Sequence, residues 1–146
     1  MDSDIVENFD LVFDAIYSEF KTFLGKNYDI NKYLRPIEVH SFFPAIDIVP
    51  DTTNIEASYI GGSRNVVHTF QIFLMESLQV PTEMEPMISR LDEVVNLIEE
   101  MRDSEKTVMN YLDDLQITQI KYFYEIAENF VIHVSQITLR CEKIGL

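Results

Sequence analysis

Side chains that could perform chemistry are few and scattered along the sequence. The three histidines, His40, His68 and His133, have no close-spaced partners of the kind that a zinc site needs. His68 and His133 fall in β-prone segments, where a histidine is more often a packed or hydrogen-bonded residue than a ligand. The single cysteine, Cys141, lies near the end of a β-prone segment and is interpreted as a small buried hydrophobe. We therefore expect no metal site, no cofactor and no catalytic residue.

Two other features resemble sites but are interpreted as structural. A general acid/base pair needs carboxylates in different environments, which the exposed face of a helix does not provide. Gly61-Gly62 is not a phosphate loop, because no Lys-Ser/Thr follows and no helix begins there, so we predict a turn. The acidic residues of the helix predicted over 82–103, which fall largely off its apolar stripe and form a solvated face, are Asp92, Glu93, Glu99, Glu100 and Asp103. The sequence thus predicts a protein that is not an enzyme.

Composition limits the possible partners. The 146 residues suit a single domain (1–146), and 47% apolar with 12% aromatic residues can form a sizeable core. Eleven basic against 25 acidic residues give a net charge of −14, which argues against binding to DNA phosphates or to an anionic membrane. A single cysteine and an N-terminal segment unlike a signal peptide indicate synthesis in a reducing compartment, and no apolar run is long enough to span a bilayer.

The spacing of apolar residues predicts two long helices and five β segments. Residues 5–24 repeat apolar side chains at helical intervals and end at Gly25, and residues 82–103 form a second amphipathic helix behind a capping-box pattern. The segments predicted as strands are 45–49 (ended by Pro50), 55–60, 66–75, 117–126 and 130–141. Residues 26–43 are predicted to be irregular and 104–114 to form a loop, with turns at Gly61–Asn65 and Glu128-Asn129.

This order, α-β-β-β-α-β-β, predicts an α+β fold with a mostly antiparallel sheet and both helices packed on one face. The β segments alternate poorly, since Phe73 and Phe123 oppose other apolar side chains on their strands. One helical layer covers one sheet face, so we expect another chain to cover the second. The hypothesis that follows is an oligomer whose sheets meet between subunits.

Three stretches in succession resemble a known family. They are Phe43–Pro50 (FPAIDIVP), the polar hairpin through Tyr59-Ile60-Gly61-Gly62, and His68–Leu74 (HTFQIFL), followed by a Pro-led loop and a long acidic helix. This order of elements is similar to that of the tail terminator (tail completion, minor tail) proteins of long-tailed bacteriophages. The resemblance spans most of the chain and rests on element order and a short apolar motif.

The resemblance implies a structural virion protein, made in the host cytoplasm, that forms a homohexameric ring at the head-proximal end of the tail. Such a ring ends polymerisation of the tail tube protein and joins the neck or head-completion proteins, while DNA passes through the lumen without being read. An acidic chain suits that passage, because negative charge does not grip phosphate. The candidate contact residues, on the 51–65 hairpin and the second sheet face, are Tyr59, Ile60, Arg64, Phe73 and Phe123.

Two alternatives remain open. One is another phage connector, such as a head-completion, neck or tube-like protein of the same build. The other is a small ligand-binding or regulatory α+β domain, or an enzyme whose site is assembled at a subunit interface. A pocket lined by His68 or His133 with a nearby carboxylate would favour this second alternative.

Overall fold

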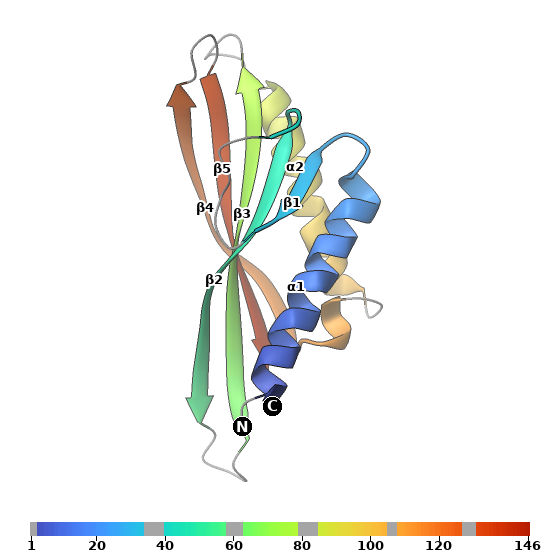
Figure 1. Cartoon of the computed structure of the whole chain (residues 1–146), viewed down its shortest axis with the longest axis vertical. Helices are drawn as coiled ribbons and strands as arrows, with labels where there is room; N and C mark the ends of the chain where they lie inside the picture. Colours follow the sequence, from blue (N-terminus) through green and yellow to red (C-terminus); the bar gives the residue numbers. More distant parts are fainter. Residues whose placement is uncertain (1–2, 34–39, 58–62, 79–84, 105–107, 127–130) are drawn as a thin grey trace.

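The computed structural model describes residues 3–33, 40–57, 63–78, 85–104, 108–126 and 131–146 (Figure 1). The elements are α1 (Ser3–Leu24), β1 (Asp29–Lys32), β2 (Ala45–Ala57), β3 (Arg64–Leu78), α2 (Glu85–Asp103), a 3₁₀ turn (Val108–Asn110), β4 (Asp114–Ile126) and β5 (Val131–Lys143). The strands form one five-stranded sheet in the order β1-β2-β3-β5-β4. Every neighbouring pair is antiparallel except β1 and β2, so the predicted α+β class is confirmed.

Helix α1 follows from its periodic apolar residues and its ends. An acidic residue, Asp4, lies in the first turn and Lys21 in the last, where each interacts favourably with the helix dipole. Gly25 N–H donates to the Lys21 carbonyl at 3.1 Å and ends the helix. A Cβ on Gly25 would lie 2.2 Å from that carbonyl oxygen, which explains why glycine occupies the position.

Both helices pack on one face of the sheet, as predicted (Figure 1). In β3, alternate residues from Val66 to Leu74 are buried, because successive side chains of a strand point to opposite faces. Cys141 is fully buried in the same core, and burial raises the pKa of its thiol, so it is a core residue as predicted. The largest fully buried side chains are Tyr28, Phe20, Phe70, Ile16, Ile46, Ile48, Ile72, Leu74, Ile98, Met101, Leu115 and Ile137.

Two strand predictions were wrong. Segment 45–49 and the described part of segment 55–60 belong to one strand, β2, which continues through Pro50 with a register shift between Pro50 and Thr52. Proline is tolerated there because β1 pairs with β2 only as far as Ile48, and Pro50 therefore lies on an edge beside a bulge. The first strand in the sheet is β1 instead, four residues long within the segment predicted to be irregular.

Other boundaries differ by a few residues. Strand β4 begins at Asp114, three residues before the predicted start, and β5 continues to Lys143. The predicted turn at Gly61–Asn65 is wrong at Arg64 and Asn65, which belong to β3. Gly61-Gly62, the predicted turn at Glu128-Asn129 and the start of the second helix at 82–84 lie outside the described residues. Within the described ranges, no helix is long and apolar enough to cross a membrane.

Candidate assembly surfaces

An apolar cluster lies on the outer face of the sheet, the face opposite the helices. Phe73 of β3 and Phe123 of β4 both pack against it, so two candidate contact residues that are distant in sequence share one surface. Both side chains are half-buried. The cluster consists of buried Ala45, Met75 and Val134 with partly buried Phe43, Phe73, Phe123 and Ile132.

The other candidate contact residues are not part of this cluster. Arg64 begins β3 and pairs with Ala57 at the far end of the β2–β3 hairpin. Its backbone N–H donates to the Leu146 carbonyl at 3.2 Å, and its own carbonyl accepts from the Leu146 N–H at 2.8 Å. Arg64 therefore joins the hairpin to the C-terminal end of the chain. Tyr59 and Ile60 lie outside the described residues.

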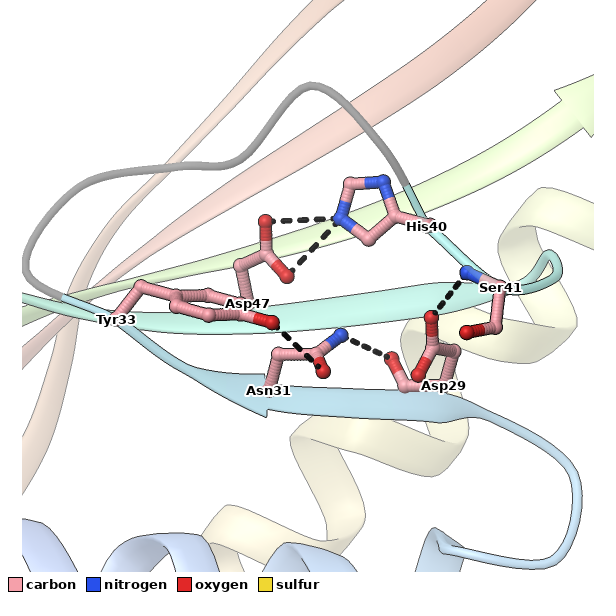
Figure 2. Close-up of polar contacts among 6 residues, drawn as sticks. All are labelled: Asp29, Asn31, Tyr33, His40, Ser41 and Asp47. Carbon is pink, nitrogen blue, oxygen red and sulfur yellow. Dashed lines mark hydrogen bonds and ion pairs between the residues drawn. The ribbon is translucent and has the colours of Figure 1, made fainter.

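A buried polar pair fixes the segment before β2 against the outer face (Figure 2). Asp47 projects from β2 and is fully buried, and His40 Nε2 lies 3.0 Å and 2.9 Å from its two carboxylate oxygens. Their side chains are 3% and 0% exposed. The ring N–H donates to a carboxylate that has little access to water, and such a bond is stronger than one at the surface.

Neighbouring bonds extend this attachment to β1. Ser41 N–H donates to Asp29 Oδ2 at 2.8 Å, and Tyr33 Oη donates to Asn31 Oδ1 at 3.2 Å (Figure 2). Part of the outer face over β1 and β2 is thus covered by the chain itself. The expectation that another chain covers the second face as a whole needs this correction.

The outer face becomes polar toward the β2–β3 hairpin. Gln71 Oε1 accepts from Gln136 Nε2 at 3.0 Å and from Thr138 Oγ1 at 2.9 Å. Gln71 Nε2 donates to Asp51 Oδ2 at 3.0 Å. These bonds satisfy the polar side chains across β2, β3 and β5. The outer face therefore combines the apolar cluster around Phe73 and Phe123 with a polar region around Gln71.

His68 is a hydrogen-bonded sheet residue, as predicted. Asn8 Nδ2 donates to the Tyr111 carbonyl at 2.9 Å, which leaves Asn8 Oδ1 to accept from His68 Nε2 at 2.8 Å. On the other side, Thr53 Oγ1 lies 3.0 Å from His68 Nδ1. Burial lowers the pKa of the ring and so favours its neutral form, and a neutral ring with its proton on Nε2 can accept from the Thr53 hydroxyl at Nδ1. This network ties α1 to β2 and β3.

The lowered pKa of His68 predicts that acid destabilises the fold. Unfolding returns the ring to an ordinary pKa of about 6.5, so its contribution is complete above that pH and is lost as the pH falls through the folded value. Burial lowers the pKa of His133 in the same sense, whereas burial raises that of Glu76, which acts oppositely. Urea unfolding at pH 7.5 and 5.5 should show a smaller loss for His68→Gln than for wild type. Parallel losses would contradict this assignment.

Of His68 and His133, His133 is the one that lies opposite a carboxylate residue in the sheet. It lies directly opposite Glu76 in the sheet, and the Glu76 carboxylate is 3.5 Å from Arg90 of α2. Among the described residues, His133 Nδ1, Ser135 Oγ and Glu76 Oε2 are buried without a hydrogen-bond partner. On β4, Tyr122 and Tyr124 lie opposite Ser135 and His133 and are 54% and 67% exposed. The polar atoms thus lie beside an uncovered aromatic surface on the helix side of the sheet.

Two grooves open elsewhere on the helix side. One, of about 370 Å³, is an apolar groove between α1 and β2 and is lined by Ile5, Val6, Phe9, Thr53 and Ile55. The other, of about 280 Å³, separates α2 from β4 and is lined by Ile98, Glu99, Arg102, Leu115, Gln116 and Ile117. Neither lining includes His68 or His133. In the parts of the chain that the structure describes, no three Cys, His, Asp or Glu residues are grouped to hold a metal ion.

The apolar groove was not predicted from the sequence. Val6 belongs to the apolar stripe of the first helix, yet it is 65% exposed, and Ile55 of β2 is 52% exposed. Helical spacing identifies the stripe but not where the sheet beneath it ends. The signal present in the sequence is the polar run Asp51–Asn54 after Pro50, which lies where β2 extends beyond its β1 neighbour.

No protein-family model matches the chain, and no curated protein is similar to it. A chain from the virion of a native gene transfer agent particle is similar in structure, with 9% sequence identity and a TM-score of 0.49. The superposition covers 93% of each chain.

Proposed function

We propose that this chain is a structural virion protein, similar to phage tail terminators, that forms a homo-oligomeric ring at the head-proximal end of the tail. The observation that carries the proposal is the sheet with two open edges. In the described part of the chain, β4 pairs only with β5 along its length. After Ile48, where its pairing with β1 ends, β2 has no paired strand on the edge away from β3. Unpaired strand edges can continue a sheet into another copy, and repeated head-to-tail contacts close into a ring.

The surfaces agree with a role in assembly. Exposed apolar side chains lie at both open edges, including Ile55 on β2 and Tyr122, Tyr124 and Ile126 on β4. The apolar cluster around Phe73 and Phe123 offers a contact for a further virion protein, for which we propose the tail tube or the neck protein. A net charge of −14 suits a ring through which DNA passes without binding.

Negative-stain microscopy of the purified protein, with light scattering for the mass, tests the proposal. We expect rings of six copies with a central hole wide enough for a DNA duplex. Because each copy is strongly acidic, assembly should increase with salt, which screens the repulsion between copies. A protein that stays monomeric at micromolar concentration, at both low and high salt, would contradict the proposal.

A tube-like or head-completion protein is the main alternative, since the same open edges suit either role. The microscopy also distinguishes these cases. Single rings that do not stack agree with a terminator, whereas rings that stack into long tubes indicate a tube protein.

A further inference from the structure

Two exposed apolar sites lie at opposite edges of the sheet. At the β2 edge, the apolar groove is bordered by Val6 and Ile55, which are 65% and 52% exposed. At the β4 edge, Tyr122, Tyr124 and Ile126 are 54%, 67% and 79% exposed. Large apolar side chains grouped at a free strand edge mark a surface that another strand covers.

Both sites lie on the helix side of the sheet. Ile55 pairs with Val66, which is fully buried toward the helices, and with Thr53 it lines the groove under α1. Tyr122 and Tyr124 alternate with Phe123, which faces the outer cluster, so they point to the helix side. A sheet that continues from one copy to the next therefore places these side chains on the same face.

The strand directions are also compatible. Strand β2 is antiparallel to β3, β3 to β5, and β5 to β4. Strand β4 therefore runs antiparallel to β2 within one copy. When copies are arranged around an axis in the same orientation, β4 of one meets β2 of the next as an antiparallel pair, without inverting either copy.

We infer that β4 of one copy pairs with the free part of β2 in the next copy, with Tyr122 opposite Ile55 and Lys121 opposite Glu56. This inference rests on the proposed ring. In this register Tyr124 faces Thr53, so both tyrosine rings cover the apolar groove beside Val6. Charge selects this register, because a shift of two residues keeps the apolar contacts but moves Lys121 away from Glu56. Glu56 and Lys121 are both exposed and of opposite charge.

The same contact covers the polar atoms that lack partners. His133 and Ser135 lie beside Tyr124 and Tyr122 on the helix side, where neither helix of their own copy covers the tyrosines. The first turns of the neighbouring α1 would lie over this surface. The two acidic residues on the free part of β2, Asp51 and Glu56, disfavour pairing of β2 with β2, while Lys121 opposite Glu56 favours β4 against β2.

The inferred register sets a large offset between copies. Glu56 lies in the same row as Asn65 of β3, whereas Lys121 lies in the row of Phe73, eight residues further along that strand. Successive copies are therefore displaced by about 26 Å along the strands. A closed ring with such an offset has strands inclined to its axis, as in closed barrels.

Disulfide trapping tests the register in the full chain. In the variant with Glu56→Cys and Lys121→Cys, mild oxidation should link copies into a ladder of oligomers up to the ring size. The two positions are about 30 Å apart within one copy, given the strand spacing and rise, so an internal disulfide is excluded. The matched control combines Glu56→Cys with Tyr122→Cys, which places the thiols on opposite faces. Each single-cysteine variant controls for the buried Cys141.

Reversing the charges at the two exposed positions, Lys121 and Glu56, tests the register independently of the disulfide. Lys121→Glu alone and Glu56→Lys alone should each weaken assembly by about 1.5- to 5-fold per interface, and the double reversal should restore it. Analytical ultracentrifugation measures the assembly midpoint of each variant, and circular dichroism checks folding.

The outcomes separate the inference from the proposed function. Wild-type rings without the cross-link between positions 56 and 121, or a double reversal that fails to restore assembly, overturn the inferred pairing and leave the ring intact. A link formed by one single-cysteine variant indicates a two-fold contact between like edges and also overturns the pairing. A monomeric wild type overturns the proposed function itself.

Discussion

Replacing His40 by alanine is expected to lower the free energy of unfolding by about 3–5 kcal/mol. Asp47 is fully buried, and His40 Nε2 contacts both of its carboxylate oxygens at 3.0 Å and 2.9 Å. Removing the ring takes a hydrogen-bond donor from a carboxylate that water cannot readily reach, and the loss of a bond to a buried carboxylate is costly. Urea unfolding of the monomer at pH 7.5 measures the change.

Two variants show whether burial causes the effect. Lys32→Ala removes an exposed ion pair with Asp14, whose side chains are 34% and 54% exposed, and should change stability by less than about 1 kcal/mol. The double variant with His40→Ala and Asp47→Leu removes both polar groups and should be more stable than His40→Ala alone. If His40→Ala and Lys32→Ala cost the same, the buried pair does not stabilise the fold.

The helices and the sheet face toward them follow from local patterns in the sequence. Helical spacing identifies the buried face of α1, including Val12, Ile16 and Phe20. Strand alternation likewise identifies the helix-facing residues of β3, because a period of two places every second side chain in the core. These signals are strong because α1 and β3 are long and each places one continuous row of side chains in the same core.

The pairing of strands depends on contacts that the local sequence does not contain. Pro50 normally ends a strand, yet β2 continues past it because that position lies on an edge beside a bulge. Strand β1 has four residues, too few for a periodic signal, and its parallel pairing with β2 is held by the Asp29–Ser41 and His40–Asp47 contacts. These contacts join segments whose spacing resembles no known motif.

The contacts at Phe73 and Phe123 were predicted from poor alternation in the strands, and this signal has a limit. It correctly marks Phe73 and Phe123 as apolar residues on the outer face, where they share one cluster. It does not mark the exposed side chains of Val6 and Ile55, because each lies on the apolar side of its own element. Their exposure results from where the sheet ends beneath α1, a property of the whole fold.

The second large effect is expected at Phe70, which links the sheet to α1. Phe70 is fully buried and lies 5.7 Å from the ring centroid of Phe9 and 5.4 Å from that of Phe13. Phe70→Ala should lower the free energy of unfolding by about 3–5 kcal/mol, because it removes apolar contacts and leaves a cavity under α1. For a chain of this length, the melting temperature should fall by roughly 6–20 °C.

Phe70→Leu keeps most of the volume and should cost less than about 1.5 kcal/mol, so a folded variant is available even if the alanine variant is marginal. Phe23→Ala is the matched control, because Phe23 lies on the exposed side of α1 with 63% of its surface accessible and should have little effect. Thermal and urea unfolding below the assembly concentration compare all three. Equal losses for Phe70→Ala and Phe23→Ala would mean that α1 does not pack on β3 in solution, and the apolar groove between α1 and β2 would then not exist as described.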